Sequence, residues 1–138
     1  MAYWLMKSEP DVYSYDDLVR DGEGTWDGVR NHAAALHLKA MQVGDEALFY
    51  HSIIGKEAVA VMTISATAMP DPTEPEGTRW VAVKVKPLRK LARPIPLSLI
   101  KDEPRLADMA MIRQSRLSVS PVRESEWKVL MALAGEGD

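Results

Sequence analysis

Four short segments of the sequence carry polar or aromatic side chains that could bind a ligand, each where a strand-like or helix-like stretch begins or ends. Their candidate ligand-binding residues are Lys7 and Ser8; Trp26, Val29 and Asn31; Tyr50, His51 and Ser52; and Arg116, Leu117 and Ser118. Polar residues at a strand end commonly line a site, although a surface loop or a buried aromatic residue is the plainer alternative for each segment. Together, the four segments supply the groups that a pocket for a nucleobase requires.

A base pocket needs three kinds of chemical group. An aromatic face, here that of Trp26, stacks on the base and contributes about 1–3 kcal/mol per base. Asparagine, serine and backbone groups read the polar edge of the base by its donors and acceptors. A lysine or arginine at the rim contacts the adjoining phosphate. Because taking a base out of a duplex costs free energy, such a pocket favours single strands, damaged sites or free nucleosides.

The sequence lacks the common signatures of catalysis and of metal binding. It contains no GxSxG, P-loop, GxGxxG or HExxH motif and no cysteine. His32 and His37 are five residues apart, whereas ligand pairs on a helix are three or four residues apart. The glycine-rich segment 21–28 lacks the lysine of a phosphate-binding loop and is predicted to be a turn. The sequence therefore predicts a protein that is not an enzyme and that has no cofactor and no metal.

Composition and charge restrict the kind of nucleic-acid binding. Of 138 residues, 46% are apolar and 27% are charged, which is typical of a globular protein. The formal net charge of −3 argues against a protein that coats nucleic acid through its phosphates, but it permits recognition of one base. One basic run is predicted to contact a nucleic-acid backbone, with a solvated strand as the alternative. Its cations are Lys84, Lys86, Arg89, Lys90 and Arg93.

The elements that must position these residues are short. Strand patterns cover residues 3–7, 48–52, 57–69, 80–86 and 117–119, with a hairpin turn at Gly55 and a loop at 70–77. Helices are predicted from Ser14 to near Gly22, over 31–41, as short turns over 97–111, and over 124–134. Pro94 and Pro96 are expected to break the chain.

Residue alternation and the tryptophans give further expectations. In the strand at 80–86, Ala82 is expected to face outward, since it lies between inward-facing valines. Trp80 and Trp127 are predicted to belong to the core. Trp26, as a pocket wall, is expected to be less tightly packed than Trp127.

Strands dominate the middle of the chain without regular βαβ alternation, so a parallel doubly wound sheet is not expected. The pattern favours an α+β fold: a small mixed or antiparallel β-barrel with flanking short helices, forming one domain over residues 1–138. No apolar run approaches the roughly 18–20 residues of a membrane span, and residues 1–7 lack a signal-peptide pattern. We therefore expect a bacterial cytoplasmic protein without a membrane partner.

Several motifs resemble those of the EVE domain family in order and spacing. They are YWLMKSEP, WDGVRN, MQVGDEALFYHS, a PD before the proline-rich loop, and RLSV followed by PV, and they span about residues 2–134. The resemblance implies a PUA-like fold, a small bent β-barrel with flanking helices. This fold is similar to that of YTH domains, which bind N6-methyladenine in RNA through an aromatic cage. The implied partner is a DNA or RNA bearing a modified base, such as a modified cytosine or adenine.

Carried onto this chain, the resemblance gives each candidate segment a role. Trp26 becomes the stacking wall, Lys7–Ser8 lie at the pocket mouth, and Asn31 lies near the pocket. Tyr50–Ser52 form the other side. Arg116–Ser118 close the pocket, with the arginine near a phosphate.

Two other functions remain open. PUA-like relatives of the ASCH group include small amidohydrolases that act on acylated nucleosides, and Lys7 with Glu9 could activate a nucleophile and transfer a proton. The lysine must then be desolvated or paired to lose its proton near neutral pH. The second alternative is a protein-interaction adaptor built on the same barrel.

Overall fold

The computed structural model describes residues 1–76 and 79–136. Its strands form one sheet in the order β2-β5-β4-β3-β1-β6. They are β1 (Tyr3–Ser8), β2 (Gly24–Trp26), β3 (Glu46–His51), β4 (Glu57–Pro70), β5 (Val81–Pro96) and β6 (Val119–Val122). β1 and β3 pair in parallel and the other neighbours pair antiparallel, so the predicted α+β class with a mixed sheet is confirmed.

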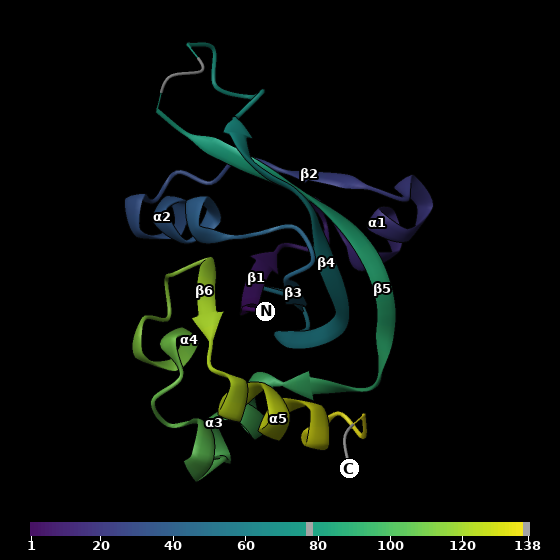
Figure 1. Ribbon diagram of the computed structural model, residues 1–138. Coiled ribbons are helices and arrows are strands. Elements are labelled where there is room, and N and C mark those ends of the chain that lie inside the picture. The colour runs from purple at the N-terminus through teal and green to yellow at the C-terminus, as the bar shows by residue number, and fades with distance from the viewer. Residues whose placement is uncertain (77–78, 137–138) are drawn as a thin grey trace.

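The sheet is strongly bent but not closed. In Figure 1, β4 and β5 are long ribbons that curve around the middle of the molecule. Among the described residues, the outermost strands β2 and β6 do not pair with each other. A closed barrel, as the sequence predicted, is therefore not confirmed by the strand pairing.

Short helices cover the sheet. They are α1 (Tyr15–Asp21), α2 (His32–Ala40), α3 (Leu97–Asp102), the 3-10 turn η1 (Pro104–Leu106), α4 (Ala110–Arg113) and α5 (Glu124–Leu133). α1 begins as predicted, because Ser14 and Asp17 form a reciprocal capping box, and it ends at Gly22 in the left-handed conformation. None of the helices in the described ranges has the length and apolarity that crossing a lipid bilayer requires.

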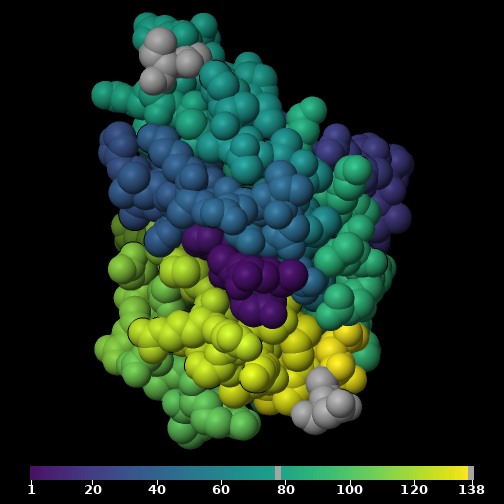
Figure 2. All heavy atoms as spheres, in the orientation of Figure 1, coloured from purple at the N-terminus to yellow at the C-terminus, as the bar shows by residue number. Residues whose placement is uncertain are grey.

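Two hydrophobic clusters lie on opposite sides of the sheet, and alternation along the strands separates them. In β1, Trp4 and Met6 belong to one cluster, whereas Leu5 belongs to the other. The first cluster packs under α1 and α2, and the second packs under α3 to α5. In Figure 2 the N-terminal residues lie on the surface between the α2 region above and the α5 region below.

β5 is longer than predicted, because it continues through Pro94 to Pro96. The register with β4 shifts between Ala58 and Ala60, where the β5 segment 91–94 stands opposite a single residue. Pro94 lies inside this bulge, where a missing N–H group removes no ladder hydrogen bond. The prolines therefore do not break the strand. Ala82, expected to face outward, is fully buried.

β2 was not predicted, and the expectation of a turn over 21–28 is wrong for its central part. Gly24–Trp26 pair antiparallel with β5, and Trp26 lies opposite Val83. Three residues are too few to display a strand's alternation, which explains the error. The last strand begins at Val119, whereas the sequence pattern placed it over 117–119.

Candidate functional site

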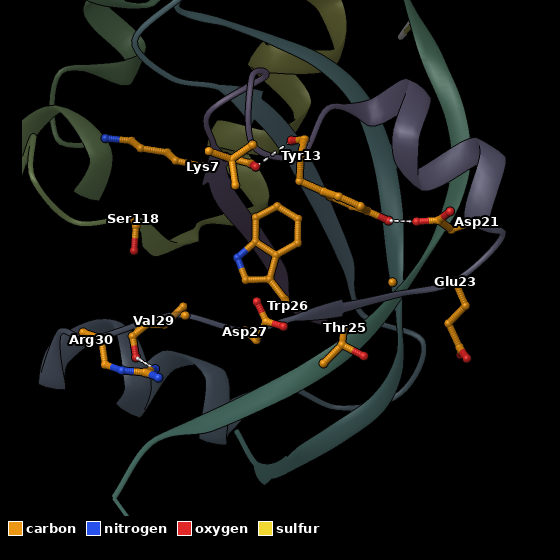
Figure 3. A pocket seen from close by; sticks show the side chains of 14 residues that line it. Lys7, Tyr13, Asp21, Glu23, Thr25, Trp26, Asp27, Val29, Arg30 and Ser118 are labelled. Carbon is orange, nitrogen blue, oxygen red and sulfur yellow. Dashed lines mark hydrogen bonds between the residues drawn. The ribbon is translucent and has the colours of Figure 1, made fainter. Parts of the chain in front are cut away.

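A pocket of about 590 Å³ opens between the end of β1, the loop that follows it, and β2 with the segment after it. Figure 3 shows Trp26 in the middle of this pocket, with side chains of β1 and α1 on one side and of residues 27–30 on the other. Five of the predicted ligand-binding residues line it: Lys7, Ser8, Trp26, Val29 and Ser118. We call this cavity the base-sized pocket.

Strand pairing brings these distant residues together. β1 lies between β3 and β6, and the backbone N–H of Lys7 donates to the carbonyl oxygen of Ser118 at 2.8 Å. β2 pairs with β5 at the other end of the sheet order, so the bend of the sheet carries Trp26 toward the end of β1. The pocket is therefore formed where the curled sheet approaches itself.

Trp26 is a wall of the pocket and also part of the core. Its side chain packs edge-on against Phe49, with ring centroids 5.3 Å apart and planes at 80°. It is 7% exposed and Trp127 is 6% exposed, so the expectation that Trp26 is less tightly packed is wrong. A residue can present one ring face to a cavity while the rest of the indole is buried.

Tyr13 is a second aromatic residue of the pocket, and sequence reasoning missed it. Its hydroxyl donates to Oδ2 of Asp21 at 3.0 Å, and burial together with that carboxylate raises the pKa of Tyr13 to about 12. Its backbone carbonyl accepts a 2.6 Å hydrogen bond from the hydroxyl of Ser8. The only sequence signal is an aromatic residue directly before the Ser14 helix cap.

Gly24 allows Tyr13 to lie close to β2. A Cβ atom at this position would lie 2.9 Å from the Tyr13 hydroxyl oxygen and 3.1 Å from a methyl carbon of Leu18. Any larger residue would therefore push the tyrosine ring out of place.

Asp71 fixes the segment that follows Trp26. Its side chain is buried and accepts hydrogen bonds from the Gly28 N–H at 2.8 Å, from Arg30 Nη1 at 2.9 Å, and from the N–H and hydroxyl of Thr73 at 2.7 and 2.6 Å. Burial alone would raise the pKa of Asp71, but these donors outweigh it and hold the pKa at about 2. The sequence signal was the PD of the quoted motif, to which no role was assigned.

Two ionisable side chains that line the pocket have pKa values shifted from their usual ranges. Burial raises the pKa of Asp27, and the nearby charge of Asp71 raises it further. Burial lowers the pKa of Lys7, whose Nζ donates to the carbonyl oxygen of Ser115 at 2.9 Å. The pocket thus holds a carboxyl group that protonates more readily than usual and a lysine directed toward backbone.

A second depression, which we call the outer groove, continues from the pocket mouth. It has a volume of about 510 Å³ and shares four residues with the base-sized pocket: Lys7, Ser8, Val12 and Ser118. Beyond these, it is lined by Glu9, Ser52, Ile53 and Arg116. Two further predicted residues, Ser52 and Arg116, therefore lie beside the mouth rather than inside the pocket.

The remaining predicted ligand-binding residues lie elsewhere. Asn31 caps α2 by accepting from the Ala34 N–H at 2.9 Å, and with Leu117 it borders a separate shallow depression. Tyr50 is buried in the cluster on the opposite side of the sheet from Trp26. His51 lines another small cavity, where Nε2 accepts from a backbone N–H and burial lowers the pKa of the imidazole.

The basic run does not line the base-sized pocket. Arg89 pairs with Glu136 at 2.8 Å, and Lys90 pairs with Asp16 at 3.1 Å. Lys84 stands opposite Thr25 in the ladder with β2. The cations that border the pocket and the outer groove are instead Lys7, Arg30 and Arg116.

The other tryptophans differ from each other. Trp127 is core as predicted and stacks on Tyr3 at 4.4 Å between centroids. Trp80 is only partly buried, which corrects the core prediction. It stacks on His32 at 4.8 Å, and the Arg30 guanidinium lies 5.7 Å from its ring centroid.

Within residues 1–76 and 79–136, no group of three or more His, Asp or Glu side chains is arranged to hold a metal ion.

Comparison with known proteins gives a consistent result. The EVE domain family model matches residues 2–133. Human thymocyte nuclear protein 1 is 32% identical over 165 residues, which cover 96% of this chain and 73% of that protein. A solved structure from Rhodopseudomonas palustris is 49% identical with a TM-score of 0.91, covering 98% of this chain and 94% of that chain.

Two solved structures contain nucleic acid. The human THYN1 protein in complex with DNA containing 5-methylcytosine is 30% identical with a TM-score of 0.92, and the superposition covers 100% of this chain and 100% of that chain. The YTH domain of the Zygosaccharomyces rouxii MRB1 protein, in complex with N6-methyladenosine RNA, is 19% identical with a TM-score of 0.60, covering 99% of this chain and 88% of that chain. The latter likeness shows a shared fold alone, and it confirms the structural relation to YTH domains.

Proposed function

The chain belongs to the EVE domain family, and we propose on that basis that its base-sized pocket binds one modified base of a nucleic acid without catalysing a reaction on it. The observation that carries the proposal is the position of Trp26, an aromatic wall beside the carboxyl group of Asp27. The complex of the related human THYN1 protein with DNA containing 5-methylcytosine supports it.

Stacking on Trp26 provides most of the affinity for the base. Its core contact with Phe49 holds the indole rigid, so little side-chain entropy is lost when a base binds. Tyr13 adds a second aromatic surface in the same pocket. A stacked base contributes about 1–3 kcal/mol, which corresponds to a gain in affinity of roughly tenfold or more at the upper part of that range.

Asp27 reads the polar edge of the base. A carboxylate accepts hydrogen bonds from an exocyclic amino group, as Asp and Glu do with N4 of cytosine. Because burial raises the pKa of Asp27, the carboxyl group takes up a proton from solvent more readily and can then donate a hydrogen bond to a base that offers an acceptor there. The hydroxyl of Ser8 is already committed to the Tyr13 carbonyl and serves mainly to hold the loop.

Phosphates next to the bound base are contacted from the outer groove. Arg116 is exposed on the border of that groove. The basic run on β5 lies farther from the pocket lining, and we propose it as a second backbone contact, for a strand that extends beyond the bound nucleotide.

Binding without catalysis is the preferred form of the proposal. Lys7 donates to the Ser115 carbonyl, and Glu9 lines the outer groove but not the base-sized pocket, so Glu9 is not placed beside a base that stacks on Trp26. The amidohydrolase alternative is tested with N4-acetylcytidine. If the wild type releases cytidine and Lys7→Ala does not, the protein is an amidohydrolase and the proposal of binding without catalysis is wrong.

The direct test is a titration of labelled oligonucleotides that carry 5-methylcytosine, N6-methyladenine or no modification, each as DNA and as RNA. We expect one modified base to bind best and Trp26→Phe to weaken its binding, because phenylalanine keeps the core contact but offers a smaller stacking face. Trp127→Phe is the matched control, since Trp127 is equally buried on the other side of the sheet. A folded protein with no affinity for any oligonucleotide would favour the adaptor function.

A further inference from the structure

The loop that connects β3 and β4 holds an apolar residue in a strained conformation. Ile53 has a backbone φ of 68°, and the N–H of Ile54 donates to the Ser52 carbonyl at 2.7 Å, closing a tight turn with Ile53 at its centre. A positive φ is unfavourable for a β-branched residue, and the turn with this φ is the rare, strained form. Glycine or asparagine would relieve the strain, so the isoleucine is the costlier choice for the fold alone.

The side chain of Ile53 is also exposed to solvent. It is 66% exposed, and Ile54 is 53% exposed. Single exposed apolar residues are common on proteins, but Ile53 lines the outer groove together with Val12, which is 74% exposed. The strained turn therefore places an apolar side chain at the mouth of the candidate pocket.

The chemistry around this side chain is that of a nucleic-acid contact. Val12 lines both the outer groove and the base-sized pocket, so the apolar rim is continuous with the entrance. Arg116 lies in the same groove and can meet a phosphate. An apolar side chain beside a cation and next to the pocket is placed to contact the bases and the backbone that flank a base held in the pocket.

Resting on the proposed function, we propose that Ile53 is a wedge that enters the base stack of a double-stranded nucleic acid when the modified base is turned out into the pocket. Turning out a base costs unstacking and unpairing energy and leaves a gap in the duplex. Apolar wedges that insert between base steps are a common device of proteins that deform a duplex. Ile53 lowers the cost of opening by filling the gap, while Trp26 receives the base.

The test separates the wedge from the pocket by comparing two probes of one sequence. One is a DNA duplex with a single 5-methylcytosine, and the other is the modified strand alone. Ile53→Gly should weaken binding of the duplex by about tenfold, equivalent to about 1.4 kcal/mol, and leave binding of the single strand unchanged. Since glycine accepts the positive φ, this variant should unfold at no lower urea concentration than the wild type.

Two further variants control the interpretation. Ile53→Asn also tolerates the positive φ but replaces the apolar tip by a polar one, so it should lose duplex binding as Ile53→Gly does. Val43→Ser removes an equally exposed aliphatic side chain in the turn before β3, at a position that lines neither cavity, and should change neither Kd.

The outcomes are distinct. Unchanged duplex binding in both Ile53 variants overturns the wedge, and so does an equal loss for duplex and single strand, which would make Ile53 part of the pocket itself. A wild type that binds neither probe nor any other modified oligonucleotide overturns the proposed function, and the wedge with it.

Discussion

Arg30 and Asp71, 41 residues apart in the sequence, form an ion pair of 2.9 Å that ties the segment after Trp26 to the end of β4. The carboxylate is buried, and it also accepts from the Gly28 N–H, so it fixes both the backbone and a side chain of the pocket wall. The position of Asp27 and Val29, which lie on either side of Gly28, depends on this one carboxylate.

Asp71→Asn should lower the free energy of unfolding by about 3 kcal/mol, because breaking a buried pair leaves a donor or charge without compensation. It should also weaken binding of the modified base, since the pocket wall is released. Urea unfolding measures the first effect and anisotropy titration the second. Asp108→Asn, which breaks the exposed pair with Arg113, should cost less than about 1 kcal/mol. Equal effects of the two substitutions would contradict this role of Asp71.

Acid should remove the contribution of Asp71. A carboxyl group whose pKa falls on folding stabilises the protein above its unfolded pKa, and this stabilisation is lost as pH falls through the folded pKa. For Asp71 the window runs from 3.8 down to about 2. The difference in unfolding free energy between wild type and Asp71→Asn should therefore shrink by about 2 kcal/mol across that window. If the difference in unfolding free energy between wild type and Asp71→Asn does not change with pH, the charge of the Asp71 carboxylate is not the source of the stabilisation.

Trp26→Ala and Trp127→Ala should destabilise the protein similarly, each by about 3–5 kcal/mol, because both side chains are almost fully buried. Only Trp26→Ala should affect base binding, measured at a temperature where both variants remain folded. Loss of binding in Trp127→Ala alone would move the site to the other side of the sheet.

Much of the scaffold could be predicted from local signals. Ser14 with Asp17 marked the start of α1, and Gly22 marked its end, since capping depends on residues close in sequence. The first part of β5, over residues 81–86, and the helix α5 followed from periodicity. β2 could not be predicted in this way, because its three residues are a strand only through pairing with β5.

The candidate site was harder to predict, because it depends on which way each side chain points. Tyr50 and His51 are consecutive strand residues, and the period of two places them on opposite faces of the sheet, so they cannot both line one pocket. Asn31 could have served either as a helix cap or as a polar ligand-binding residue, and its side chain caps α2. The role of Asp71 required knowledge of contacts with residues far away in sequence.

Binding of a modified cytosine should weaken as the pH falls below neutral, because burial and the nearby charge of Asp71 raise the pKa of Asp27, so that this acceptor loses its charge at a higher pH than an ordinary carboxyl group does. Asp27→Asn should bind more weakly at neutral pH but lose this pH dependence. Titrations of one oligonucleotide at several pH values test both points. A wild type and a variant with parallel pH profiles would assign the dependence to another group.

Salt dependence should separate the two proposed backbone contacts. Arg116→Gln should reduce the slope of log Kd against log salt by about 1, as expected for the loss of one phosphate contact. The combined change of Lys84, Lys86 and Lys90 to glutamine should reduce it further on long oligonucleotides but not on short ones. An unchanged slope on long strands would remove β5 from the interface.

The place of β1 in the sheet has a consequence for how the protein is made. Tyr3 in this first strand pairs with Glu46 on one side and with Val122 on the other. While the chain is still emerging from the ribosome, β1 must wait for β6, which follows it only after the whole of the remaining sheet, and contacts so distant in sequence slow folding. The hydrogen bond from Lys7 to Ser118 can form only after the segment leading into β6 has been synthesised, so a nascent chain lacks a complete pocket until then.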